Sequence, residues 1–310
     1  MIEKYIIDTD IGDDIDDAFA LEYAVNAGLD IIGVTTVFRN AYLRAKLSAY
    51  LLRLCGKKVP VYAGEDLPLV QAVDAIQKAD RYLQPQELAK VMREGKGWLP
   101  EYLPRARRSK VSKERAVDFL IDSAKRNGER LGILAIGPLT NLARAFQKDF
   151  ESMRKIGGVY LMGGNVSQDT AEWNIRLDPE AADIVFRANV PVFLIGSDMT
   201  WKHCMVSNEE LCNIKQSEGA VAKANRAMLE LWENQPLYRG RMPCMHDSLV
   251  VATVVCPACV SYKKMFVRIG LCGAERGKTI AGAGAPINVA CKVNETLFRR
   301  SMWKNIFSEK

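Results

Sequence analysis

Strand-like apolar runs alternate with helical segments from the first residues of this 310-residue chain. The runs are rich in β-branched residues, and the segments between them carry helical periodicity or end at glycine. Strands are predicted at 5–7, 31–38, 59–63, 131–136, 159–162 and 190–195, and helices at 18–27, 42–55, 139–146 and 179–188. This order is typical of an α/β fold with an open, mostly parallel sheet flanked by helices.

Two segments interrupt the alternation. Residues 65–118 are polar and contain four prolines, and residues 207–245 are helical with little strand character. Because no linker or internal repeat separates the chain into parts, we predict one domain, residues 1–310, with these two excursions. In such sheets, ligands bind beyond the carboxyl ends of the strands.

Composition excludes several classes of protein. Hydrophobic residues make up 48% of the chain, which rules out disorder, and the balance of 43 basic to 37 acidic residues gives no reason to expect nucleic acid. No apolar run is long enough to span a membrane, and the first residues do not resemble an export signal, so a cytoplasmic protein with reduced thiols is expected. Around Cys256 and Cys259 we predict the end of a helix, stopped by Pro257, in preference to a redox pair or half a zinc site.

The sharpest local feature is an acidic segment directly after the first predicted strand. Six aspartates fall within residues 8–17. Carboxylates this close repel one another and raise one another's pKa, so a cation among them is needed to keep them ionised. Asp16 and Asp17 begin a predicted helix, whose dipole accounts for two of the six. The all-oxygen donor set predicts a site for calcium or magnesium.

Two known acidic motifs, the EF-hand and the haloacid-dehalogenase-like phosphatase motif, are alternatives for this segment. An EF-hand needs a glutamate at the twelfth position of its loop, but counting from Asp8 or Asp10 gives Phe19 or Leu21. A haloacid-dehalogenase-like phosphatase would use Asp8 as nucleophile, but Gly12 breaks its motif. The phosphatase stays open as a minor alternative.

Three further places carry chemical groups at predicted strand or helix ends. Residues 136–141 (IGPLTN) end a strand and offer a backbone carbonyl. Glu172 and Asn174 follow the strand that ends in 161–164 (LMGG), and they supply an acceptor and an amide suited to hydroxyl groups. His246 and Asp247 begin an apolar helical run.

In their order along the chain these segments resemble the inosine–uridine-preferring nucleoside hydrolase family, from Asp8 to the helix near Phe307. The matching segments are 8–21, 36–40, 60–64, 137–141, 161–164, 172–174 with 178–181, and 246–247. The resemblance implies the nucleoside hydrolase fold and calcium-dependent hydrolysis of the N-glycosidic bond of ribonucleosides, which yields ribose and a free nucleobase. It also implies a small-molecule nucleoside as partner and a homodimer or homotetramer, with no nucleic acid or membrane.

The resemblance also implies roles for individual residues. Calcium would be bound by Asp10, Asp17 and Asp247 with the carbonyl of Ile136. The ribose would contact Asp16, Asn40, Met162, Glu172, Asn174 and Asp247. We expect Asp10 to act as general base, and His246 to protonate the departing base because its usual pKa lies near neutrality. Asp14, Asn165, Trp232 and Tyr238 are additional candidates.

The acidic segment departs from the family pattern by two extra residues between Gly12 and Asp16. Asp14 is therefore an alternative member of the metal shell, and Asn165 is the candidate for the 5′-hydroxyl. The nucleobase is left open. A non-catalytic, calcium-dependent nucleoside-binding protein on the same scaffold is the main competing hypothesis.

Overall fold

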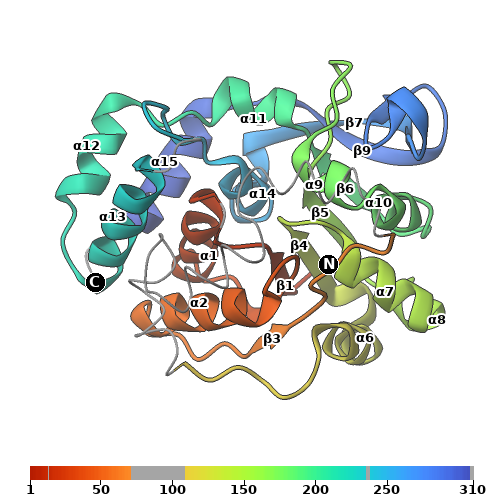
Figure 1. Ribbon diagram of the computed structural model, residues 1–310, viewed down its shortest axis with the longest axis horizontal. Coiled ribbons are helices and arrows are strands. Elements are labelled where there is room, and N and C mark those ends of the chain that lie inside the picture. The colour runs from red at the N-terminus through yellow and green to blue at the C-terminus, as the bar shows by residue number, and fades with distance from the viewer. Residues whose placement is uncertain (13, 71–108, 235–237, 308–310) are drawn as a thin grey trace.

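The computed structural model describes residues 1–12, 14–70, 109–234 and 238–307. In these residues nine strands form one sheet, in the order β3-β2-β1-β4-β5-β6-β9-β7-β8 (Figure 1). The strands are β1 (Lys4–Thr9), β2 (Ile31–Thr36), β3 (Val61–Ala63), β4 (Leu131–Ala135), β5 (Gly158–Met162), β6 (Val192–Ile195), β7 (Val260–Ile269), β8 (Thr279–Ala281) and β9 (Ala285–Val293).

The sheet is mostly parallel, as predicted. All neighbours from β3 across to β9 pair parallel, whereas β7 is antiparallel to both β9 and β8. The strand order reverses between β1 and β4, and such a switch point opens a crevice at the carboxyl ends of the strands. Asp8 of β1 is in register with Thr35 of β2 and Ala135 of β4, so the segments that follow these strands leave the sheet at one level.

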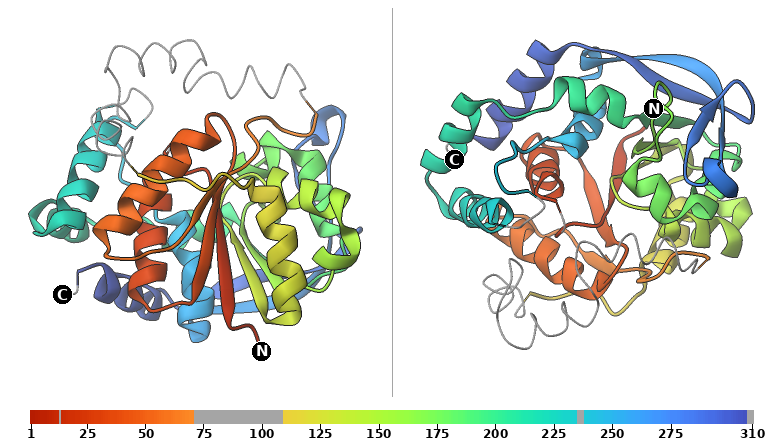
Figure 2. Two further views of the ribbon diagram at one scale, coloured as in Figure 1. Left: turned by 90° about the horizontal axis from the view of Figure 1, so that it is seen from below. Right: turned by 45° about the horizontal axis from the view of Figure 1, so that its top comes forward.

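Helices cover both faces of the sheet. They are α1 (Asp16–Asn26), α2 (Ala41–Leu54), α6 (Ala116–Asn127), α7 (Thr140–Lys148), α8 (Phe150–Met153), α9 (Trp173–Leu177), α10 (Pro179–Phe186), α11 (Ser197–His203), α12 (Asn208–Gln216), α13 (Ala220–Glu233), α14 (His246–Val255) and α15 (Glu295–Ile306). Figure 2 shows α1 and α2 on one face and α6 and α7 on the other. No helix of the described residues is long and apolar enough to cross a membrane.

Each face of the sheet has its own hydrophobic core. Ile7 belongs to the cluster that includes α1, α2 and α14, whereas its neighbour Ile6 belongs to the cluster of α6, α7 and α10. Successive side chains of a strand point to opposite faces, which explains this division. Helix α1 is buried along almost its whole length against α14 and α15. It therefore holds the two aspartates of its first turn in a fixed position.

The structure also adds elements that the sequence pattern did not reveal. The strands β7, β8 and β9 were not predicted. In β7 the apolar pattern is interrupted by the exposed Lys263 and Lys264, and β8 has only three residues. Most of the excursion predicted at 65–118 lies outside the described residues, and 207–245 contains α12 and α13. Helix α14 ends before Cys256, and Pro257–Cys259 form a 3-10 turn, which confirms the predicted helix stop.

Candidate active site

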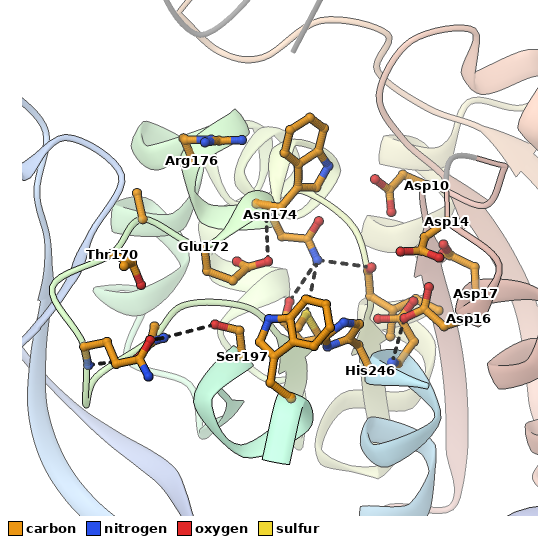
Figure 3. A pocket seen from close by; sticks show the side chains of 18 of the residues that line it. Asp10, Asp14, Asp16, Asp17, Thr170, Glu172, Asn174, Arg176, Ser197 and His246 are labelled. Carbon is orange, nitrogen blue, oxygen red and sulfur yellow. Dashed lines mark hydrogen bonds between the residues drawn. The ribbon is translucent and has the colours of Figure 1, made fainter. Parts of the chain in front are cut away.

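A cavity of about 490 Å³ lies at the carboxyl ends of β1, β4 and β5 (Figure 3). Twelve of the fourteen residues singled out from the sequence line it: Asp10, Asp14, Asp16, Asp17, Ile136, Met162, Asn165, Glu172, Asn174, Tyr238, His246 and Asp247. The other two, Asn40 and Trp232, are not in its lining. The topological switch point thus brings together segments that are more than 200 residues apart.

Three carboxylates form a compact cluster in this cavity. Asp16 and Asp17 come from the first turn of α1, and Asp247 comes from the first turn of α14. Each offers an oxygen, and these oxygens lie within 4.8 Å of one another. The backbone N–H of Asp247 donates a hydrogen bond of 3.2 Å to Asp16, which ties the two helix starts together. All three side chains are buried.

Burial and mutual repulsion work against the charged state of this cluster. Burial raises the pKa of all three carboxyl groups, and the neighbouring carboxylates raise it further: Asp14 acts on Asp16, and Asp10 acts on Asp17. At an effective dielectric constant of about 20, two unit charges 4.8 Å apart repel by about 3 kcal/mol. Repulsion of this size is a large fraction of the free energy of unfolding of a domain, which is about 5 to 15 kcal/mol.

The donor chemistry of the cluster fits a hard divalent cation. Asp10 contributes a further carboxylate to the same cavity, and Ile136, whose carbonyl accepts a hydrogen bond from Asn174, also lines it. Gly137 permits their close approach, because a Cβ there would lie 2.9 Å from a carboxylate oxygen of Asp10. Oxygen donors of this kind are the ligands that calcium and magnesium prefer. A bound cation would also offset the repulsion among the three carboxylates.

A buried arginine from α2 holds the acidic segment in place. The Arg44 guanidinium donates hydrogen bonds to the carbonyls of Asp10 and Ile11, and also to that of Phe38. Thr9 donates its hydroxyl to the carboxylate of Asp17. These contacts fix the backbone of the segment from outside the cavity. Sequence reasoning missed Arg44, because nothing in a helical pattern marks one arginine as pointing inward.

Asp8 belongs to the scaffold below the cavity. It is fully buried, and its carboxylate accepts hydrogen bonds from Thr35 at 2.5 Å and from Asn141 at 2.7 Å. Burial raises the pKa of Asp8 to about 7. Asn141 also bonds the backbone of Thr36 and Glu65, so it joins the ends of β1, β2 and β3. Asp8 does not line the cavity, which argues against its use as a phosphatase nucleophile.

The wall opposite the aspartates is built by α9 (Figure 3). Glu172 precedes this helix and accepts backbone hydrogen bonds from Gly164, Asn174 and Ile175. Burial raises the pKa of Glu172, although these hydrogen bonds oppose the shift. The Asn174 amide donates to the carbonyls of Ile136 at 3.3 Å and Met162 at 3.1 Å. Both Asn174 donors are therefore used by the scaffold, and its oxygen is the atom suited to accept a hydrogen bond from a ligand.

His246 lies between the acidic cluster and a polar helix. Its Nδ1 is 2.5 Å from the Thr200 hydroxyl of α11, and the ring makes an edge contact with Trp201 at 4.7 Å. Burial lowers the pKa of His246 to about 4, so the imidazole is neutral at pH 7. Sequence reasoning did not select Thr200 or Trp201, because their proximity to His246 depends on how α11 packs against α14.

The remaining candidates have distinct positions. Asn165 lines the cavity, and its amide accepts from Ser167 and Gln168 and donates to Ser197 at 3.3 Å. Asn40 is exposed at the start of α2 in a left-handed conformation with φ of 54°. Trp232 is buried in α13 and stacks on Tyr238.

Comparison with known proteins identifies the class to which this fold and site belong. The model of the family described as inosine-uridine preferring nucleoside hydrolase matches residues 5–300. The chain therefore belongs to this family of enzymes, which hydrolyse N-glycosyl bonds. That assignment confirms the resemblance found in the sequence.

Individual relatives cover almost the whole chain. It is 32% identical to "Uridine nucleosidase 1" of Arabidopsis thaliana over 91% of this chain and 82% of the relative. It is 27% identical to "Pyrimidine-specific ribonucleoside hydrolase RihB" of Escherichia coli over 97% and 94%. Among solved structures, a purine-preferring ribonucleoside hydrolase from Gardnerella vaginalis is 26% identical, with a TM-score of 0.79 and 98% coverage of both chains. "Plant nucleoside hydrolase - PpNRh1 enzyme" shares the fold, with a TM-score of 0.82 at 24% identity and full coverage of both chains.

Proposed function

We propose that this nucleoside hydrolase is calcium-dependent and cleaves ribonucleosides to ribose and a free nucleobase. The observation that carries the calcium proposal is the cluster of Asp16, Asp17 and Asp247, whose charges need a cation at the floor of the cavity. Family membership supports the reaction type. A cytoplasmic location and a homodimeric or homotetrameric assembly remain predictions.

The ion would be held by Asp10, Asp17 and Asp247 with the carbonyl of Ile136, and Asp16 would complete the negative environment. When bound, calcium lowers the pKa of a water molecule and attracts the ribose diol. Asp10 is our candidate base because its carboxylate lines the cavity beside the cluster. Its role is to take the proton from the attacking water.

The ribose would lie between the two walls of the cavity. Asp16 and the oxygen of Asn174 would accept hydrogen bonds from its hydroxyl groups, and Met162 would pack against the ring. Glu172 is held by backbone donors, so its main contribution is charge that opposes the positive charge of an oxocarbenium-like transition state. Asn165 is the candidate for the 5′-hydroxyl. Asn40 would need to approach the cavity from its exposed position.

His246 is our candidate for the group that protonates the departing base. The imidazole is neutral at pH 7 in the free enzyme. Negative charge that builds on the departing base raises the pKa of His246, because an opposite charge nearby stabilises the charged form, so the imidazole takes up a proton from solvent and passes it to the base. We take uridine as the first substrate to test, because relatives named uridine nucleosidase or probable uridine nucleosidase are 28 to 32% identical to this chain.

Ribose release from uridine, cytidine, inosine and adenosine tests the proposal. The enzyme is first stripped with a chelator and then assayed with and without added calcium. We expect cleavage of at least one nucleoside, loss of cleavage with the chelator and recovery with calcium. Full activity in the stripped enzyme would refute calcium dependence, and calcium-dependent nucleoside binding without cleavage would favour the non-catalytic alternative.

A further inference from the structure

Asp14 is hydrogen-bonded to helix α13, which is distant from it in sequence. Its Oδ1 accepts a hydrogen bond of 2.8 Å from the indole nitrogen of Trp232, which lies in α13, and one of 2.7 Å from the backbone of Ile15. Asp14 lines the cavity together with Asp16 and Asp17. Figure 3 shows the Asp14 carboxylate on the same side of the cavity as these two aspartates. The position of one acidic side chain in the site therefore depends on α13.

Trp232 contacts the site in a second way through its ring. The ring stacks on Tyr238 with centroids 4.6 Å apart and planes 19° from parallel, and Tyr238 lines the cavity. Trp232 itself is 3% exposed and, together with Ile11 and Ile15 of the acidic segment, lines a second, small cavity. One indole thus holds a carboxylate with its edge and an aromatic cavity wall with its face.

If Trp232 served only to fill the core, the kind of hydrogen-bond acceptor for its N–H would not matter, and a backbone carbonyl would be enough. Here the acceptor is a carboxylate of the site, and hydrogen bonds to charged groups are stronger than neutral ones. Trp303 of α15 provides a useful contrast. Its indole also donates to a carboxylate, that of Glu210, but neither residue lines the cavity.

We propose that Trp232 is a positioning residue that fixes Asp14 beside the ion site through its N–H and holds Tyr238 against the substrate through its ring. The part of this inference that concerns substrate rests on the cleavage reaction of the proposed function. The part that concerns the ion rests only on its calcium site.

The ion arm uses calcium titrations by calorimetry on the chelator-stripped enzyme. Trp232→Phe removes the N–H and keeps an aromatic ring, and it should weaken calcium binding about tenfold, the equivalent of one charged hydrogen bond. Trp303→Phe is the matched control and should bind calcium as the wild type does. Asp14→Ala should weaken binding at least as much, and the Asp14→Ala/Trp232→Phe double variant should be no weaker than Asp14→Ala alone. Wild-type affinity in Trp232→Phe, or additive losses in the double variant, would overturn the proposal.

The substrate arm separates the N–H from the ring. At saturating calcium, Trp232→Phe keeps a ring against Tyr238, so its KM should rise less than that of Trp232→Leu. Trp232→Leu and Tyr238→Leu remove the stack and should raise KM several-fold even at saturating calcium. An unchanged KM in both leucine variants would refute the role of the ring. If the wild type cleaves no nucleoside, the proposed reaction is wrong, but the calcium titrations still decide the role of the N–H. If a Trp232 variant does not fold, Asp14→Ala tests the ion part and Tyr238→Leu tests the substrate part.

Discussion

Two clusters of carboxylates in this protein have opposite environments. Asp16, Asp17 and Asp247 are buried together, and their pKa values are raised by burial and by one another. Glu210 and Glu295 instead meet the guanidinium of Arg299, at 2.6 Å and 2.9 Å. Burial alone would raise the pKa of Glu210, but the hydrogen bonds from Ser207, Arg299 and Trp303 outweigh it and lower the pKa.

The difference separates a structural cluster from a functional one. The folded chain itself satisfies Glu210, whose charge links α12 to α15. In the described part of the chain, the pKa of each aspartate in the cluster stays raised even though the charge of Arg44 opposes the shift at Asp17, so we expect a bound cation to stabilise the cluster. A buried group without a compensating charge costs stability, and such groups persist mainly at functional sites. The following predictions test whether the two clusters behave in these opposite ways.

The largest effect is expected from neutralising the aspartate cluster. Asp17→Asn and Asp247→Asn each remove one charge with little change of shape, so they should weaken the ion site and cut ribose release by about a thousandfold or more. Asp183→Asn, in a surface pair with Arg187, is the matched control and should leave turnover unchanged. Turnover within tenfold of the wild type in both cluster variants would contradict the functional assignment.

His246 lies next to the aspartate cluster, and its substitution tests whether the chemistry extends to the departing base. His246→Ala should slow cleavage of uridine by about a hundredfold, the usual size of a general-acid effect. An aryl riboside whose leaving group needs no proton should lose much less. Steady-state rates on the two substrates give the comparison, and equal losses would remove His246 from the acid role.

Arg299→Met should affect stability and leave the chemistry intact. The substitution removes the hydrogen bonds to both glutamates and to the carbonyl of Met205. The free energy of unfolding should fall by about 2 kcal/mol, since a charged hydrogen bond is worth that much. Urea denaturation measures this loss, while ribose release at 25 °C should stay the same. A large loss of turnover in the folded variant would contradict the assignment of a purely structural role to the Glu210 and Glu295 cluster.

The smallest effect concerns the pH dependence of stability. Because the pKa of Glu210 is lowered in the folded state, its contribution is present above the unfolded value of about 4.3 and is lost as the pH falls through the folded pKa. The difference in unfolding free energy between the wild type and Glu210→Gln should therefore shrink between pH 6 and pH 3. Urea denaturation at several pH values measures it, and a constant difference would contradict this assignment.

The fold was predictable from the sequence because it follows from local patterns, and most residues that line the cavity were predictable because their segments resemble those of the nucleoside hydrolase family. The alternation of strands and helices defines the sheet, and the aspartates at 8–17 lie in one segment after β1. The contacts of Arg44, Thr200 and Trp232 were not predictable. Each is an ordinary residue of a helix, and the partner that matters lies 33 to 218 residues away. The strands β7, β8 and β9 were also missed, since β7 is half exposed and β8 has only three residues.

The most direct test of the central claim is thermal unfolding of the chelator-stripped protein and of its Asp247→Asn variant, each with and without calcium. Without calcium the variant should melt at a higher temperature than the wild type, because one repulsive charge is gone. Calcium should raise the midpoint of the wild type by several degrees and leave the variant nearly unchanged. A stripped wild type that melts above the variant and does not respond to calcium would contradict the account.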